Sequence, residues 1–152
     1  MADIENKSDD RGRIVVGIDG SSGSLLALEW AARQAELTGA SLAVVAVWEW
    51  PTALGWSVIP EGFNPAGDAQ KMLEPILSSL RSLHPHMALE YKIVEGHPAP
   101  VLVSESRNAE LVVVGSRGHG EFVGMLIGST SEHCTANAAC PVVVVRDNTS
   151  HK

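Results

Sequence analysis

Five short apolar segments, separated by stretches with helical periodicity, constrain the fold of this chain more than any other feature. They are Ile14–Ile18, Leu42–Val47, Leu89–Val94, Leu111–Val114 and Val142–Val145. The first, fourth and fifth are almost entirely Val, Ile and Leu, which is typical of strands covered on both faces. The third alternates apolar with charged residues, which predicts an edge strand half open to water. Strict alternation of strands and helices predicts a doubly wound α/β fold, with a parallel sheet and right-handed crossovers.

Four helices are predicted around these strands. The first has apolar residues at helical spacing between 25 and 35, with Ser21 or Ser22 as its N-cap and Gly39 as its C-cap. The second has an apolar stripe between 72 and 83, in which Pro75 either kinks the helix or marks its first turn. The other two are predicted over about Ala99–Asn108 and Thr130–Ala138, and the irregular stretches are Trp48–Gly67 and Gly115–Gly128.

Length, charge and cysteine content limit the classes of protein that the chain can belong to. Its 152 residues fit one domain, predicted over 13–146, with flexible tails at 1–12 and 147–152. The net charge of −7, without a block of Lys or Arg, argues against a nucleic-acid partner. The polar start is expected to be a flexible tail and not a signal peptide, and no apolar run is long enough to cross a membrane. Cys134 and Cys140 form no CxxC pair and are expected to be reduced thiols, so we expect a cytoplasmic protein.

The strongest functional signal is the glycine-rich stretch after the fourth strand. It runs Gly115-Ser116-Arg117-Gly118-His119-Gly120, and Gly128-Ser129 then opens a helix. Glycines let successive amides turn toward one phosphate, and a helix N-terminus favours an anion through its unpaired amides and its dipole. Arg117 is a cation that could reach the phosphates or remain solvated. The alternative is a purely structural loop, in which Ser129 and Glu132 form a capping box that needs no ligand.

The turn after the first strand carries Asp19, followed by Gly20-Ser21-Ser22-Gly23. In open α/β sheets ligands bind at the carboxyl ends of the strands, so Asp19 could coordinate Mg²⁺ or accept hydrogen bonds from a ribose. The alternative is that its side chain only closes an Asx-type turn before the helix.

Known catalytic signatures are missing, so no catalytic residue is assigned. There is no GxxxxGK[ST] motif, the loop after the fourth strand reads GxxGxG and not GxGxxG, and no Gly-x-Ser-x-Gly elbow occurs. The remaining histidines show no metal-ligand spacing and are expected at the surface; they are His84, His86, His97, His133 and His151.

The chain resembles the universal stress protein family from Arg13 to Arg146. The resemblance rests on Val-Gly-Ile-Asp-Gly-Ser at the first strand, Gly96-x-Pro98 after the third, and Val-Val-Gly-Ser-Arg-Gly-His-Gly after the fourth. It also includes Leu-Ile-Gly-Ser-Thr-Ser and the closing Cys-Pro-Val-Val-Val-Val-Arg. The most specific part is Gly115-x2-Gly118-x9-Gly128-Ser129, which is similar to the motif of the ATP-binding members.

This resemblance implies a strand order of 3-2-1-4-5 and a bound ATP with Mg²⁺. By position, Gly118, Gly128 and Ser129 would hold the phosphates, with Gly115 beside the ribose. Asp19 would meet the ribose or the metal, Val47 would offer its backbone to adenine, and Gly17 and Ile18 would lie against the base or sugar. Thr130 is also a candidate nucleotide-binding residue. The chain departs from the family in having Glu121 where Gly is common and Thr130 where Val is common.

The resemblance also implies a homodimer. In the implied strand order Val142–Val145 is an edge strand, and four consecutive valines on an open edge invite pairing with a second copy.

Three functions remain open at this point. The first is an ATP-binding regulator of stress or signalling, with little or no hydrolysis. The second is a slow Mg²⁺-dependent ATPase or a nucleotidyl- or phosphotransferase that uses Asp19 and His119. The third is a dimeric scaffold that binds no nucleotide.

Overall fold

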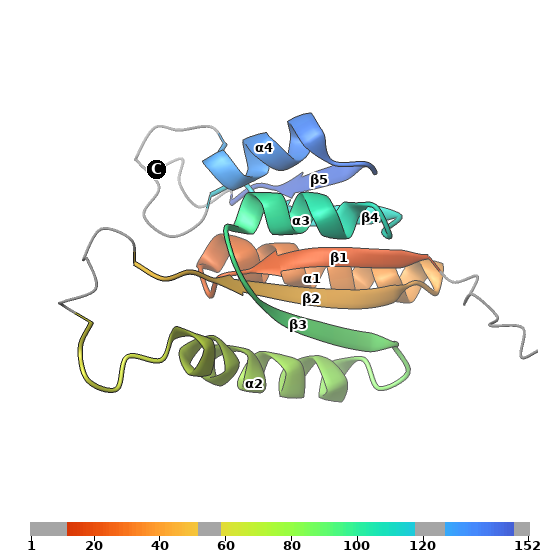
Figure 1. The fold of residues 1–152 in the computed structure, drawn as a ribbon. Coiled ribbons are helices and arrows are strands. Elements are labelled where there is room, and N and C mark those ends of the chain that lie inside the picture. The colour runs from red at the N-terminus through yellow and green to blue at the C-terminus, as the bar shows by residue number, and fades with distance from the viewer. Residues whose placement is uncertain (1–11, 52–58, 118–126, 148–152) are drawn as a thin grey trace, which may run out of the picture.

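A computed structural model shows a five-stranded parallel sheet in the order β3-β2-β1-β4-β5 (Figure 1), and it describes residues 12–51, 59–117 and 127–147. The strands are β1 (Arg13–Ile18), β2 (Ser41–Trp48), β3 (Leu89–Glu95), β4 (Leu111–Gly115) and β5 (Val142–Val145). The helices are α1 (Ser22–Thr38), α2 (Pro65–Leu83), α3 (Pro98–Ser106) and α4 (Ser129–Asn137). The predicted fold class and strand order are confirmed, and the strand bounds differ from the predicted ones by one residue at most.

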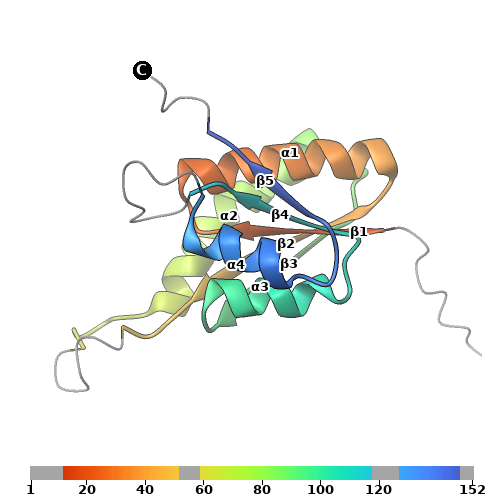
Figure 2. The same cartoon turned by 90° about the horizontal axis from the view of Figure 1, so that it is seen from above.

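Helices cover both faces of the sheet. Figures 1 and 2 show α1 and α2 on one side, and α3 and α4 on the other. Alternate strand residues pack into the two resulting cores: Val16 and Val44 face α1 and α2, whereas Val15 and Val45 face Leu102 of α3 and its neighbours. All five side chains are almost completely buried. A strand buried on both faces explains why the central segments contain so few polar residues.

The predicted ends of α1 are confirmed. The Ser21 side chain accepts a hydrogen bond from the Ser24 amide at 3.2 Å, and Gly39 ends the helix with a left-handed φ of 73°. In α2, which begins at Pro65, Pro75 lies inside the helix, which excludes one of its two predicted alternatives, a place in the first turn.

Two irregular stretches are shorter than the sequence indicated. Trp48 belongs to β2 because it pairs with Glu95. The last three residues of the predicted loop 48–67, which are residues 65–67, belong to the first turn of α2. Residues 52–58 of that loop lie outside the described residues. Gly115 belongs to β4, and residues 118–126 of the glycine-rich stretch also lie outside the described part of the chain.

The environments of the two cysteines can be compared with the prediction of reduced thiols. Cys134 is buried, Cys140 is partly buried, and both are free thiols. Burial raises the pKa of the Cys134 thiol to about 11, so this group stays protonated at neutral pH. Among the described residues, no helix combines the length and the apolar character needed to cross a bilayer.

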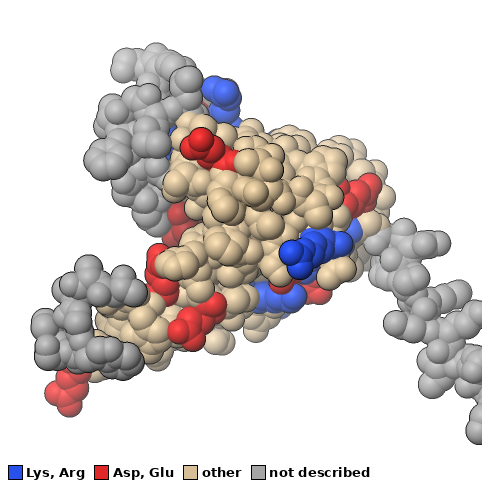
Figure 3. Space-filling view, turned by 45° about the horizontal axis from the view of Figure 1, so that its top comes forward, with Lys and Arg blue, Asp and Glu red and all other residues tan. Residues whose placement is uncertain are grey.

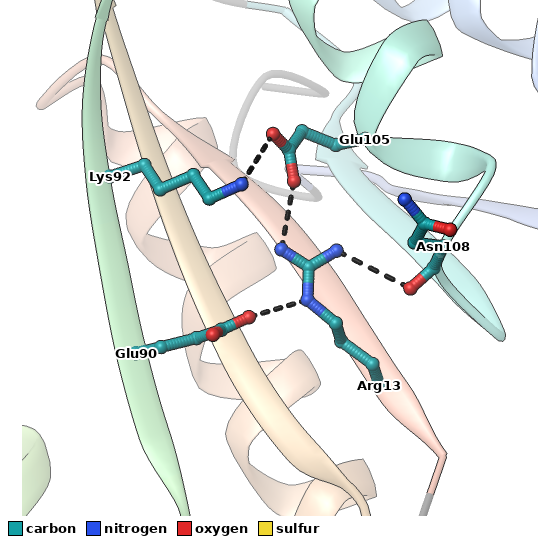
Figure 4. A network of polar contacts seen from close by, with 5 residues as sticks. All are labelled: Arg13, Glu90, Lys92, Glu105 and Asn108. Carbon is teal, nitrogen blue, oxygen red and sulfur yellow. Dashed lines mark hydrogen bonds and ion pairs between the residues drawn. The ribbon is translucent and has the colours of Figure 1, made fainter. Parts of the chain in front are cut away.

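A cluster of charged side chains joins β1, β3 and α3 near the start of β1 (Figure 4). Arg13 binds Glu90 of β3, and its Nη2 donates to Glu105 of α3 at 2.8 Å. Lys92 Nζ donates to the other oxygen of Glu105 at 2.9 Å. Glu105 therefore links three elements through charge-assisted hydrogen bonds.

Replacing Glu105 with Gln is expected to lower the free energy of unfolding at pH 7 by about 1 kcal/mol. Burial by itself raises the pKa of Glu105, but the hydrogen bonds and charges of Arg13 and Lys92 outweigh it, and the net shift is downward. Because the pKa of Glu105 is lower in the folded state than in the unfolded state, its ionised form stabilises the fold above the unfolded-state pKa. This stabilisation is lost as the pH falls through the folded-state pKa. Urea unfolding should show a constant difference in the free energy of unfolding between the wild type and Glu105→Gln above about pH 5, and this difference should disappear toward pH 3. A difference that is unchanged at pH 3 would contradict this role.

Candidate functional site

A cavity of about 590 Å³ lies at the carboxyl ends of β1, β2 and β4, between the beginnings of α3 and α4. Parallel strands end at one edge of a sheet, and the cavity sits where the strand order reverses between β1 and β4. The structure places nine of the predicted site residues on its wall: Gly17, Ile18, Asp19, Val47, Gly115, Arg117, Gly128, Ser129 and Thr130. The tenth, Gly118, lies outside the described residues, as do His119 and Glu121.

Close packing of α1 against β4 shapes the floor of this cavity. A Cβ atom added at Gly115 would lie 2.7 Å from the backbone of Gly23, and one added at Gly23 would lie 2.6 Å from the carbonyl oxygen of Arg117. Real Cβ atoms do not approach backbone this closely, so both positions require glycine. The two glycines allow the first turn of α1 to lie directly on the end of β4.

The N-terminus of α4 opens on the cavity without a cap from any described side chain. Gly128 is the N-cap residue, and Ser129 is the first residue of the helix. The capping box of Ser129 and Glu132, which the sequence left open as an alternative, is therefore absent, because Ser129 stands one position too late to cap the helix. The amides of Ser129 and Thr130 belong to the first turn, whose N–H groups have no acceptor within the helix.

Two hydrogen bonds hold this helix end against the sheet. The Ser131 hydroxyl donates to the carbonyl oxygen of Gly115, and the Gly128 amide donates to the carbonyl oxygen of Ser116 at 2.5 Å. Ser116 and Ser131 are buried, so these contacts are protected from water. They position the start of α4 on the end of β4, where the glycine motif of the sequence placed it.

The Asp19 carboxylate closes the turn before α1 and also lines the cavity. Its Oδ1 accepts hydrogen bonds from the Ser21 amide, at 2.9 Å, and from the Ser21 hydroxyl. The predicted Asx-type turn is thus present. Asp19 therefore both closes this turn and lines the cavity.

The cavity wall also includes residues that the sequence analysis did not assign to the site. They are Ser21, Ser24, Val45, Glu49, His97, Pro98, Ala99, Leu102, Val114, Ser131 and His133. The most informative are Glu49 and His97, whose Oε2 and Nδ1 atoms lie 2.6 Å apart. His97 is 75% exposed, as a surface residue was expected to be, yet it stands at the cavity. The Gly96-x-Pro98 motif was the available signal, because it places His97 directly after a strand that ends at this edge.

Acidic side chains lie near the end of the sheet at which the cavity opens. Figure 3 shows more red than blue side chains toward the left of the face in view, the side on which the strands end in Figure 1. Among the described residues no group of three or more His, Cys, Asp and Glu side chains could hold a metal ion by itself. Of the described cavity residues, Arg117 alone is a lysine or arginine, and it follows β4.

Comparison with known proteins identifies the family. The model of the universal stress protein family matches residues 11–146. The chain belongs to the universal stress protein family. The universal stress protein Rv2623 of Mycobacterium tuberculosis (strain ATCC 25618 / H37Rv) is 35% identical over 141 residues, which make up 89% of this chain and 45% of that protein. The chain thus spans about half the length of the curated relatives that it matches.

Solved universal stress proteins share the fold. One was crystallised in complex with cAMP; it has a TM-score of 0.65 and 24% identity, with 88% of this chain and 95% of that one covered. Another, from Archaeoglobus fulgidus, was solved in complex with dAMP; it has a TM-score of 0.64 and 21% identity, with 88% and 97% covered. At these identities the likeness establishes the fold of this universal stress protein and leaves its ligand to be argued from the site.

Proposed function

We propose that this universal stress protein binds ATP in the cavity and acts in the cytoplasm as a nucleotide-dependent regulator of stress or signalling. The observation that carries the proposal is the start of α4, which no described side chain caps and which places Gly128 and Ser129 on the wall that also holds Asp19 and Val47. Amides at a helix N-terminus favour phosphate, and an aspartate after the first strand suits a ribose. Relatives of this fold solved with cAMP and with dAMP support an adenine nucleotide as the ligand.

The charges on the wall favour one orientation of the ligand. Arg117 and the start of α4 lie at the β4 end, whereas the Glu49 carboxylate follows β2. A triphosphate is attracted to the first end and repelled by the second. The phosphates therefore belong beside Ser129, and the base belongs beside Val47. A chain of net charge −7 binds a polyanion better when Mg²⁺ accompanies it, so MgATP is the proposed form.

Regulation fits this site better than rapid turnover. The sequence offers no P-loop lysine, and fast phosphoryl transfer depends on cations and a positioned nucleophile around the γ-phosphate. We expect ATP to remain bound for long periods, so that occupancy itself changes what the protein presents to partners.

The test is thermal unfolding with increasing MgATP. Binding to the folded state alone stabilises it by RT ln(1 + [L]/Kd), about 2.7 kcal/mol at a hundredfold excess over Kd. For a domain of this size that raises the Tm by roughly 8 °C. Phosphate release followed in the same samples separates a binding protein from a slow ATPase. An unchanged melting curve at millimolar MgATP would favour the nucleotide-free scaffold.

We also propose that the protein forms a homodimer through β5. Its valines are each half-buried within one chain, and β5 is an edge strand of the sheet. An unpaired edge is a template for another strand, and a two-fold dimer covers it. Light scattering should give about twice the chain mass of 16.1 kDa. A dimer with a Kd of about 1 µM, a binding free energy of about −8 kcal/mol, would be largely assembled at about 100 µM. A protein that stays monomeric up to that concentration would contradict the dimer.

A further inference from the structure

Glu49 and His97 form a pair at the end of the cavity assigned to the base. Strands β2 and β3 stay paired up to Trp48 and Glu95, and the Gly96 amide then donates to the carbonyl oxygen of Trp48 at 2.9 Å. Glu49 follows Trp48 directly, and His97 follows Gly96. The pairing of the two segments holds these side chains together, with 2.6 Å between Glu49 Oε2 and His97 Nδ1. Both residues line the cavity.

The pair presents hydrogen-bond acceptors. Glu49 Oε2, which lies 2.6 Å from His97 Nδ1, is an acceptor, because a carboxylate has no N–H or O–H to donate. The second carboxylate oxygen of Glu49 is also an acceptor. A base that meets this wall is favoured if it presents an N–H donor there and disfavoured if it presents a carbonyl oxygen.

We propose that the Glu49–His97 pair makes the site selective for a purine with an exocyclic amino group at position 6, as in adenine, over one with a carbonyl at that position, as in hypoxanthine and guanine. The proposal rests on the proposed function, because it assumes that a nucleotide occupies the cavity. Within it, Glu49 is the specificity-determining residue, and His97 positions the carboxylate. A site that requires a hydrogen bond discriminates because the wrong ligand leaves its polar groups unpaired.

The experiment compares the dissociation constants of MgATP and MgITP by calorimetry. The two nucleotides differ only in the base, where ITP carries O6 and a proton on N1 in place of the amino group. The wild-type protein should bind MgATP about tenfold more tightly than MgITP. This is the low end of the discrimination expected for one such contact, because the Glu49 side chain is 53% exposed to water. In Glu49→Gln the amide can rotate to donate to O6, so the ratio of the two constants should fall to within about twofold.

Further variants test the positioning role. His97→Ala removes the neighbour that holds the carboxylate, so the ratio should fall partway. His97→Asn, whose side-chain amide can donate to Glu49, should restore part of it. Glu95→Gln is the matched control: it removes the same charge from the same edge of the sheet, but Glu95 is exposed and not on the described cavity wall. The melting temperature of each free variant shows that it is folded.

The outcomes separate this inference from the proposed function. If ATP binds and Glu49→Gln keeps the wild-type ratio, the base is read by other groups, such as the backbone of Val47, and the inference is overturned while the proposed function stands. If neither nucleotide binds the folded wild-type protein, both are overturned.

Discussion

Replacing Ser129 with Asp is expected to lower the affinity for MgATP about a hundredfold while leaving the fold intact. The new carboxylate would stand in the first turn of α4, on the wall where the phosphates are proposed to bind. Two like charges about 4 Å apart at a protein surface repel by up to about 4 kcal/mol, and about 3 kcal/mol corresponds to a hundredfold change in Kd. Calorimetry on the purified variant measures the loss.

The same substitution separates binding from folding. An acidic residue at a helix N-terminus interacts favourably with the helix dipole, so the free variant should melt at the wild-type temperature or slightly above it. Ser129→Ala is the matched control, because it removes the hydroxyl without adding charge and should weaken binding by less than about tenfold. Wild-type affinity in Ser129→Asp would show that the start of α4 does not bind the phosphates.

The second large effect is expected for Gly115→Ala, which should lower the free energy of unfolding by about 2 kcal/mol. The added Cβ atom would lie 2.7 Å from the backbone carbon and oxygen of Gly23, and backbone in the first turn of α1 cannot rotate away. For a domain of this size the expected loss in Tm is about 6 °C. Because α1 and β4 would move apart at the cavity floor, MgATP should also bind more weakly.

Gly17→Ala provides the contrast for this prediction. Its added Cβ atom would lie 2.9 Å from Cδ1 of Leu102, the end of a side chain that can change rotamer. The cost should stay below about 1 kcal/mol. Equal losses of stability in the two variants would mean that the contact between Gly115 and Gly23 is not the constraint that the structure indicates.

The sequence predicted the fold well because each element carried its own signal. Continuous Val and Ile marked the buried strands, and the ends of α1 were marked by Ser21 and Gly39. The order of the strands could not be predicted from local patterns, because the strands of a parallel sheet pair with segments that are distant in the sequence. That order came from the resemblance to a family and is confirmed by the pairing of β1 with β4.

The cavity was predictable only in part. Glycine motifs and Asp19 stand next to strands in the sequence, so their place at one edge followed from the topology. Glu49 and His97 meet through two separate strand ends, and only His97 lies within a motif, Gly96-x-Pro98. The capping box failed because Gly128 takes the cap position, which a pattern of residue types alone does not distinguish.

The most direct test of the account is the backbone amide NMR spectrum of the ¹⁵N-labelled protein during titration with MgATP and, separately, with adenosine. MgATP should shift the amide resonances of Ser129 and Thr130 strongly together with those near Val47, whereas adenosine should shift only the latter. Amides at the start of α4 that do not respond to MgATP, while the rest of the cavity does, would contradict the phosphate site on which the account depends.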